Sequence, residues 1–396
     1  MTSFHGISCS VDDLQAGMKL ASPVYDFNGK MLLGTNSCLT EKHILLLRRM
    51  LISEVEIWNK SQEIEKEEPK EENPLGLPEI PRLEEPTAAE QGLSSLWDAF
   101  WNEENSAKSS RAYVELLTKM KKLYSLARLH GDIVRDVLDE LVEEILVFSE
   151  SSQPLLRCVF FHPRQSPYIF HHSLHVTLFA VLLGKHCDFS GERLRKLTLA
   201  ALLHDVGKIQ VSLDVLGKKE PLSEEEREKV RLHTVLGFRF LQRQKAFDMP
   251  VLMGVLQHHE RLDGSGYPLR TNGEKTHVFA RIIAIADVYD AMTSQKSYGT
   301  QHSPFEALAE IRREVAAGRI DANYGRAFLT VMRANLLGEW IELSDGRLCQ
   351  LIGWGEDEKR LLYLQSLDNE RIILEADSPL KPVQIVPPLL CNLSPL

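Results

Sequence analysis

Residues 194–208 read LRKLTLAALLHDVGK, and this stretch sets the fold class of the chain. Apolar side chains recur at three- and four-residue spacing over Leu194–Leu203, a pattern that predicts a buried α-helix. The run ends in His204 and Asp205, and polar groups at the end of a buried helix are costly to desolvate unless a partner satisfies them. A metal ion is one such partner, so the stretch predicts a helix that carries metal ligands at its end.

Two other apolar runs end in the same way. Val251–Leu256 leads into Gln257-His258-His259-Glu260, and Val278–Ala286 leads into Asp287. Eleven of the 14 histidines lie between positions 162 and 302. A single histidine of this kind is usually hydrogen-bonded in the core or lies at the surface. The recurrence of such histidines at the ends of apolar runs, together with two aspartates, favours a metal centre in a mainly α domain.

The adjacent polar pairs indicate more than one metal ion. Neighbouring residues of a helix point about 100° apart, so such pairs serve two ions about 3.5–4 Å apart better than one ion. Asp205 is the natural bridge, because its two oxygens can each bind one ion. Lys208 follows one short turn later, where its ammonium could meet a phosphate; the alternative is a surface lysine after a helix end at Gly207.

The segment HHERLDGSGYP at 258–268, together with His204-Asp205, resembles the HD-GYP family of HD-domain phosphohydrolases. The resemblance runs from about Ile133 to about Leu337, roughly half of the chain. It implies an all-helical HD domain that hydrolyses cyclic di-GMP to linear pGpG or GMP in bacterial signalling. It also implies a metal centre, in many members of iron or manganese.

The resemblance implies seven metal ligands in this chain, which are His172, His204, Asp205, His233, His258, His259 and Asp287. Thr234 follows His233, at a position where family members usually have a proline. Tyr168 stands where relatives with a third metal have a glutamate, which favours two ions here. Mixed imidazole and carboxylate ligation suits iron or manganese, and it is compatible with zinc or nickel. The remaining histidines of the region, His162, His171, His175 and His186, are interpreted as non-ligands.

A mechanism follows from the two ions. Metal coordination lowers the pKa of bound water from about 16 to about 7, which provides a hydroxide for in-line attack on phosphorus at neutral pH. Asp205 and Lys208 are the catalytic residues of this hypothesis, with the lysine stabilising charge on the phosphate oxygens.

The Gly-Tyr-Pro segment predicts a rigid loop beside the His258-His259 helix end. Gly264 and Gly266 permit backbone angles that are closed to other residues, and Pro268 fixes the exit. The loop, with Asp263 and Tyr267, either has a functional role, shaping the substrate entrance or presenting a partner surface, or is a tight turn anchored by the tyrosine.

The segment after Asp287 departs from the family pattern. Members usually read Thr-Ser-Asp-Arg-Pro-Tyr and a basic residue, whereas residues 293–299 read TSQKSYG. Substrate contacts are expected from Lys208, Lys296 and Tyr298, but lysine lacks the two-point contact of arginine and Gly299 offers none. The change predicts slow hydrolysis of cyclic di-GMP or another substrate, such as cyclic GMP-AMP. A regulatory binding module without turnover is the alternative class.

Composition divides the chain of 396 residues into domains. Residues 1–60 predict a small β-rich module, with strands at Met18–Val24, Lys30–Leu33 and Val55–Trp58 and a helix capped by Thr40. Residues 61–90, with ten Glu and five Pro in their number, predict a solvated acidic linker. Residues 91–337 predict the helical domain, with its core at about 150–335. Residues 338–396 predict a second β-rich module, with strands at 340–343, 347–354, 361–364 and 371–374.

The overall charge and the cysteines limit the function classes. A net charge of −10 argues against a large basic DNA-binding face, and no apolar run approaches the roughly 20 residues of a membrane span. Six scattered cysteines without a CxxC pair, and an N-terminus without a signal-peptide pattern, predict a reduced cytoplasmic protein. Besides cyclic di-GMP, the expected partners are signalling proteins at the Gly-Tyr-Pro loop or the terminal modules, and a second copy of the chain.

Overall fold

The computed structural model describes residues 7–25, 31–41, 43–44, 47, 54–58, 104–150, 152–161, 168–216, 218, 220–294, 302–355 and 360–386. These residues fall into two compact units, Met1–Ser95 and Leu96–Leu396, which are described separately. The expected linker at 61–90 lies outside the described residues, and the domain boundaries drawn from composition stay predictions.

The first unit is built on two short antiparallel strand pairs. Strand β1 (Ile7–Ser10) pairs with β4 (Glu54–Ile57), and β2 (Val24–Tyr25) pairs with β3 (Met31–Leu33). The strand predicted at 18–24 is wrong in extent, because Lys19 and Leu20 make only isolated bridges and the paired strand begins at Val24. Thr40 caps the following turn as predicted, its Oγ1 accepting from the amide of His43 at 3.2 Å.

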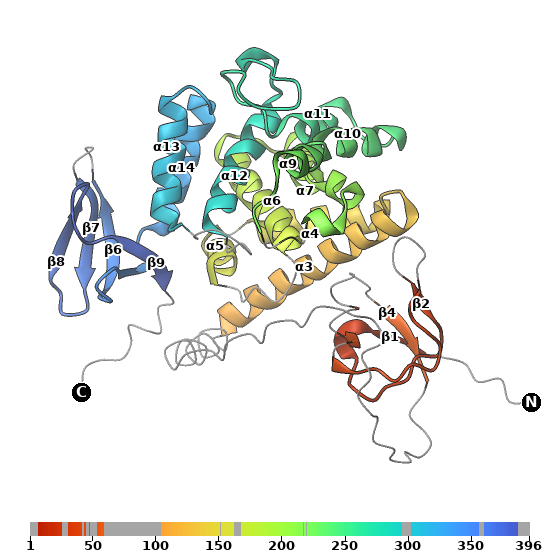
Figure 1. Ribbon diagram of the computed structural model, residues 1–396. Helices are drawn as coiled ribbons and strands as arrows, with labels where there is room; N and C mark the ends of the chain where they lie inside the picture. Colours follow the sequence, from red (N-terminus) through yellow and green to blue (C-terminus); the bar gives the residue numbers. More distant parts are fainter. Residues whose placement is uncertain are drawn as a thin grey trace, which may run out of the picture. The chain divides into compact units, whose positions relative to one another are not determined.

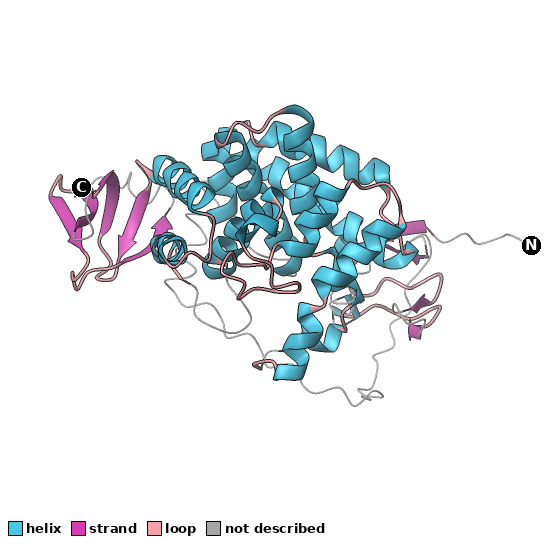
Figure 2. Cartoon of the chain, turned by 90° about the horizontal axis from the view of Figure 1, so that it is seen from above, coloured by secondary structure: helices cyan, strands magenta, loops and turns pink. Residues whose placement is uncertain are grey.

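The second unit is mainly helical (Figures 1 and 2). Its helices are α3 (Glu104–His130), α4 (Arg135–Phe148), α5 (Ser152–Phe161), α6 (Tyr168–His186), α7 (Gly191–Leu203), η2 (Val206–Gln210), α8 (Leu213–Leu216), α9 (Glu224–Arg231), α10 (His233–Arg243), α11 (Met249–Gln257), η3 (Gly273–Lys275), α12 (Val278–Thr293), α13 (Pro304–Ala316) and α14 (Ala322–Leu336). The described part therefore confirms the predicted fold class of a helical bundle with small β-rich additions.

The packing of the bundle centres on α6. Residues Phe170–Val181 of this helix are buried at every position, so it runs through the core and carries its histidines inside the bundle. Helices α7 and α12 pack on either side of it, and α3 runs along the bundle (Figure 1). Gly131, with φ +74°, separates α3 from α4.

A five-stranded antiparallel sheet follows the helices. Its strands are β5 (Trp340–Leu343), β6 (Leu348–Trp354), β7 (Arg360–Ser366), β8 (Arg371–Glu375) and β9 (Pro382–Val386), in the spatial order β8-β7-β6-β5-β9. The first four were predicted, and β9 was missed. Gly346, with φ +84°, allows the tight turn between β5 and β6.

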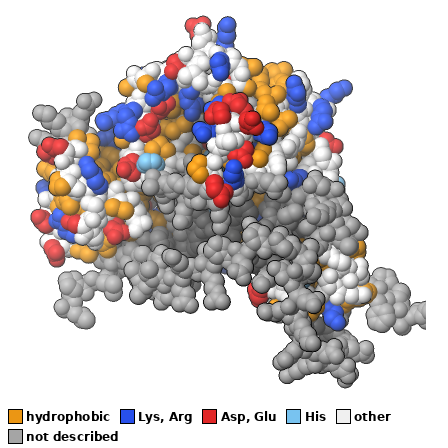
Figure 3. All heavy atoms as spheres, in the orientation of Figure 1, with side chains coloured by type: hydrophobic (Ala, Val, Ile, Leu, Met, Phe, Trp, Pro, Cys, Tyr) orange, Lys and Arg blue, Asp and Glu red, His pale blue; other side chains and the backbone are white. Residues whose placement is uncertain are grey.

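The surface of the described residues carries charges of both signs. On the face drawn in Figure 3, Lys and Arg side chains alternate with Asp and Glu, and no large basic field is seen on it. None of the helices in the described part of the chain has the length and hydropathy needed to span a membrane.

Candidate metal centre

The predicted ligands come from helix ends and two inner helices. His204 is the C-cap of α7, and Asp205 follows it with φ −98° and ψ 6°, already outside the helix. His258 is likewise the C-cap of α11, whereas His233 begins α10. The remaining ligands lie on α6 (His172), after α11 (His259) and on α12 (Asp287). All of the seven are buried except His259, which is half-buried.

These side chains form two neighbouring groups. His172, His204 and Asp287 bring ligand atoms within 4.8 Å of one another, and so do His233, His258 and His259. Asp205 faces both groups, since its Oδ1 lies 3.3 Å from His233 Nε2 and its Oδ2 lies 3.5 Å from His204 Nε2. Its two oxygens therefore stand where a bridging carboxylate needs them.

Asp287 spans the two groups as well. Its Oδ1 lies 3.1 Å from His172 Nε2, and its Oδ2 lies 3.4 Å from His259 Nδ1. The sequence analysis assigned bridging to Asp205 alone, so a second carboxylate in a similar position is a feature that only the structure reveals.

Local hydrogen bonds orient three of the imidazoles. The Nδ1 atoms of His204, His233 and His258 lie 2.7, 2.6 and 2.8 Å from the carbonyl oxygens of Ala201, Val230 and Val255, three residues earlier in each case. A neutral imidazole that donates through Nδ1 has its lone pair on Nε2. The nitrogen that faces the centre is therefore the one that can bind a metal.

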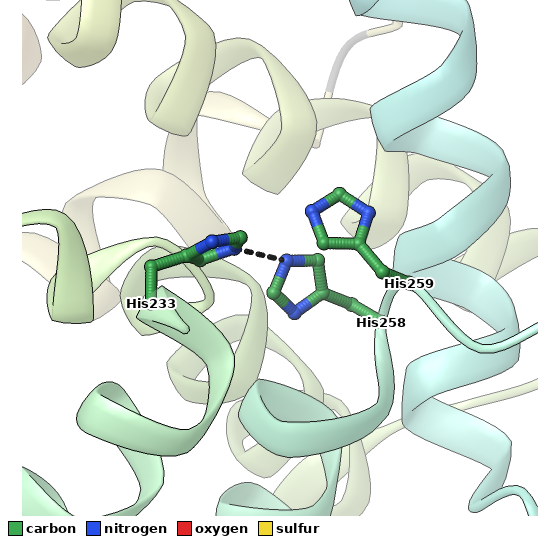
Figure 4. Close-up of side chains that lie close together, drawn as sticks. All are labelled: His233, His258 and His259. Carbon is green, nitrogen blue, oxygen red and sulfur yellow. Dashed lines mark hydrogen bonds between the residues drawn. The ribbon is translucent and has the colours of Figure 1, made fainter. Parts of the chain in front are cut away.

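This arrangement fits divalent cations. His233 Nε2 and His258 Nε2 lie 3.3 Å apart, facing each other (Figure 4), and two lone pairs at that distance repel unless a cation or proton lies between them. Within the described part of the chain, His204 Nε2 and Asp205 Oδ1 are buried and have no hydrogen-bond partner. Buried polar atoms of this kind are costly, and a cation would satisfy both.

Burial keeps most of these imidazoles neutral. It lowers the pKa of His233 to about 4, and it lowers the pKa values of His204, His258 and His259 below their usual range as well. Neutral imidazole is the form that binds a metal ion.

The titration of the remaining ligands is set by charge. Burial alone would lower the pKa of His172, but hydrogen bonds to Asp287 and Asp290 outweigh it and raise the pKa to about 9. For Asp205, burial is outweighed by Lys208 and the histidines, which hold its pKa well below the usual range. A hydrogen bond from His172 and the nearby His259 likewise hold the pKa of Asp287 well below its usual range. Both aspartates of the centre are therefore ionised at neutral pH.

The sequence analysis missed Asp290. Its Oδ2 accepts a hydrogen bond from His172 Nδ1 at 2.7 Å, and its Oδ1 accepts from His175 Nδ1 at 2.8 Å and Ser294 Oγ at 2.9 Å. The signal was present, because Asp290 lies three residues after Asp287 and such residues share a helix face. A carboxylate that holds a ligand imidazole fixes its orientation and increases its basicity.

Lys208 lies beside the centre. Its Nζ is 2.5 Å from Asp205 Oδ2, and its side chain is 19% exposed, so its ammonium faces the centre and not the solvent alone. Gly207, placed before it, lies against α10: a Cβ there would be 1.9 Å from the carbonyl oxygen of His233. This close approach requires a glycine at position 207. The sequence analysis had considered Gly207 only as a helix end, within the alternative interpretation of Lys208.

The Gly-Tyr-Pro loop is held against the helix end by backbone contacts. Gly264 has φ +79°, and a Cβ on Gly266 would lie 2.4 Å from the amide nitrogen of Arg261. The ring of Tyr267 lies over His259, with centroids 4.7 Å apart, and Asp263 accepts from Ser265 within the turn. Pro268 follows through a cis peptide bond.

Glu260 fastens the exit of this loop, a role that the sequence analysis did not assign. Its buried carboxylate accepts the amides of Leu269 at 2.6 Å and Thr271 at 3.0 Å. The expected substrate contacts Lys296 and Tyr298 lie outside the described residues, as does the side chain of Tyr168.

Comparisons with known proteins agree with this geometry. Residues 161–324 match the family described as HD domain. The chain is 32% identical over 213 residues to the cyclic di-GMP phosphodiesterase PA4108 of Pseudomonas aeruginosa, which is 54% of this chain and 50% of that protein. It is 34% identical over 158 residues to the 3′3′-cGAMP-specific phosphodiesterase 1 of Vibrio cholerae, or 40% of this chain and 36% of that protein. The chain thus spans about half or less of the length of these curated relatives.

A solved structure shares the fold. Bd1817, described as an HDG"Y"P protein from Bdellovibrio bacteriovorus, superposes with a TM-score of 0.51 over 83% of this chain and 99% of its own, at 15% identity. The likeness at this identity concerns the fold alone.

Proposed function

Residues 161–324 form an HD domain with the sequence pattern of the HD-GYP family, and from that premise we propose that the chain is a metal-dependent phosphodiesterase of cyclic dinucleotides. Cyclic di-GMP is the proposed substrate, and linear pGpG or GMP the product. The observation that carries the proposal is Asp205, a buried carboxylate whose oxygens face two groups of metal-binding side chains. Relatives that hydrolyse cyclic di-GMP support the choice of substrate.

The proposed cofactor is a pair of divalent transition-metal ions, iron or manganese, held by the seven residues. Bound ions of this kind act as Lewis acids and lower the pKa of water. His204, His233 and His258 would present preset Nε2 lone pairs to them, and Asp205 and Asp287 would supply the negative charge. Most of the polar atoms involved are already fixed, so little reorganisation is needed on binding.

Lys208 is the proposed contact for the substrate phosphate. Its Nζ lies at Asp205 with the lysine side chain only 19% exposed, so its ammonium is directed along the edge of the centre. A phosphate oxygen close to Asp205 would be within reach of this ammonium. Charge on a non-bridging oxygen would be stabilised there more strongly than in water, because the site is largely buried.

The test is the substitution Asp205→Ala in the full chain. We expect it to lose both metal ions and all turnover of cyclic di-GMP, because one residue serves both groups. Metal analysis and chromatography of the products measure the two outcomes. Asp132→Ala, which changes an exposed aspartate between α3 and α4, should leave both unchanged. Full metal loading of Asp205→Ala would contradict the bridging assignment.

The segment at 293–299 is proposed to limit the rate with cyclic di-GMP. Lys296→Arg combined with Gly299→Lys should raise kcat/KM for this substrate at least several-fold, since a hydrogen bond to a charged group contributes about 1.5–3 kcal/mol. Parallel assays with 3′3′-cyclic GMP-AMP measure preference, a comparison suggested by relatives specific for that dinucleotide. If the double variant gains nothing, the segment is a loop that is free to vary.

A regulatory module without turnover is the second candidate function, and the changed segment is what favours it. A protein that loads two metal ions but releases no product from either dinucleotide would establish it. Contacts with signalling proteins, a homodimer and a cytoplasmic location remain predictions.

A further inference from the structure

A chain of buried hydrogen bonds leads from the candidate metal centre to α3. Beyond Asp290, which holds His172, the imidazole of His175 reaches the hydroxyl of Tyr113, with 2.6 Å between Nε2 and the oxygen. The same hydroxyl oxygen lies 3.0 Å from Nδ1 of His171. All five of these side chains are at least 95% buried. Tyr113 precedes the HD-domain match at 161–324, so α3 contributes to the surroundings of the centre from outside that segment.

The donors available limit the directions of these hydrogen bonds. The carboxylate of Asp290 faces Nδ1 of His172, Nδ1 of His175 and the hydroxyl of Ser294, and a carboxylate only accepts, so His175 donates to it through Nδ1. The hydroxyl of Tyr113 lies between Nε2 of His175 and Nδ1 of His171, so it can donate to one imidazole and accept from the other.

We propose that Tyr113 is a positioning residue for the metal centre: its hydroxyl holds the ring of His175 from the side of Nε2, and His175 in turn holds the Asp290 carboxylate in the orientation that aims His172 Nε2 at the metal. The inference rests on the metal centre of the proposed function. It adds a residue of α3, the helix that follows the acidic segment, to the residues that control metal affinity.

The loss of the hydroxyl has a defined consequence. In Tyr113→Phe, Nε2 of His175 loses its contact with the hydroxyl, so the ring is held less firmly on the side away from Asp290. Its Nδ1 hydrogen bond to Asp290 then becomes more variable in geometry. The carboxylate that aligns His172 is then less well fixed, although every metal ligand is still present.

The experiment measures Mn²⁺ affinity by competition with a chelator in the metal-free full chain. Tyr113→Phe should weaken Mn²⁺ binding about 3- to 10-fold, the effect of one neutral hydrogen bond, and Asp290→Asn about 10- to 100-fold. Tyr289→Phe is the matched control. It also removes a buried hydroxyl, on α12 beside Asp290, but this hydroxyl has no hydrogen-bond partner among the described residues. It should leave the affinity unchanged.

A double-mutant cycle separates positioning from stability. If Tyr113 acts through Asp290, then Tyr113→Phe should change the Mn²⁺ affinity little in an Asp290→Asn background. Equal effects of Tyr113→Phe in both backgrounds, or wild-type affinity in the single variant, would overturn the proposal. A merely structural role would lower the unfolding temperature of the metal-free chain and leave the affinity as it is.

A second pair of variants decides the matter should Tyr113→Phe not fold. His175→Asn keeps a donor at the position of Nδ1, whereas His175→Leu removes it, so the first should bind Mn²⁺ more tightly than the second. Equal affinities would refute the link through Asp290. A wild-type chain that binds Mn²⁺ but hydrolyses no cyclic dinucleotide would refute the proposed function while leaving all of these affinity comparisons valid.

Discussion

The orientation of His204, His233 and His258 is decided within one helical turn. Each Nδ1 contacts the carbonyl oxygen three residues earlier, in the last turn of a helix. This contact gives the imidazole N–H a backbone acceptor. It also leaves Nε2 toward the centre, so the same local geometry prepares three ligands on three separate elements.

The buried histidines should make the metal-free protein sensitive to acid. The folded-state pKa of His233, about 4, lies below its unfolded value of about 6.5, so the unfolded chain binds more protons between these values. The contribution of neutral His233 to the free energy of unfolding is fully present above pH 6.5, and it is lost as the pH falls toward 4. Urea unfolding in the presence of a chelator at several pH values measures this loss.

A substitution tests the source of the acid sensitivity. His233→Gln cannot take up the proton, so its free energy of unfolding should fall less steeply over the same interval. His302→Gln changes an exposed histidine and serves as the control. A slope identical in wild type and His233→Gln would contradict this assignment.

At the scale of elements, the centre depends on the close approach of η2 to α10. Gly207 makes the approach possible, because any side chain would overlap the carbonyl oxygen of His233. The contact brings Asp205, just before η2, next to the histidine that begins α10. Two ligands that are 28 positions apart in the chain thereby become neighbours.

Gly207→Ala should therefore separate these two elements. A Cβ 1.9 Å from backbone cannot be accommodated by a side-chain movement, so we expect a loss of about 1–3 kcal/mol in stability and a weakened metal site. Chemical unfolding and metal analysis measure the two effects.

Gly273→Ala is the matched control for this glycine. Its Cβ would meet only the Cβ of Leu262, at 3.9 Å, and its backbone has no positive φ. It should be close to neutral. Equal behaviour of the two variants would show that the approach of η2 to α10 is adjustable.

At the scale of the whole molecule, the C-terminal sheet is tied to the helices of its unit. Glu339, which is 6% exposed, pairs with Arg157 of α5 at 3.1 Å. Trp354 of β6 donates from Nε1 to the carbonyl of Arg333 at 2.9 Å, and the guanidinium of that arginine lies 5.0 Å from its ring centroid. None of these residues is a candidate ligand, so the sheet contributes to stability rather than to the centre.

A chain of residues 93–337 should keep its metal ions and unfold at a lower temperature than residues 93–396. Loss of the ion pair and of the Trp354 contacts is expected to cost about 2 kcal/mol, which is roughly 4–8 °C for a domain of this size. Calorimetry and metal analysis of the two chains measure this. Equal unfolding temperatures would mean that the sheet adds no stability, and loss of the metals would mean that it supports the centre.

The sequence by itself determined the helical class and brought five candidate ligands to notice, His204, Asp205, His258, His259 and Asp287. Both depend on local information: the spacing of apolar residues sets the buried face of a helix, and polar residues that end such runs stand out. His172 and His233 were implied only by the resemblance to the HD-GYP family. Most strands of the C-terminal sheet were also readable, because alternation and an Asp-Gly turn are local signals.

Only the tertiary structure decided which residues support the ligands. Asp290 and Tyr113 are joined to His172 through space, and nothing in the sequence around residue 113 marks a hydroxyl that faces a histidine on α6. The sequence also did not reveal why position 207 must be glycine, because the group that it contacts, the carbonyl of His233, is distant in the chain. Strand β9 was missed for the same reason: it pairs with β5, some 40 residues earlier, and pairing across such a distance depends on partners that a local pattern does not contain.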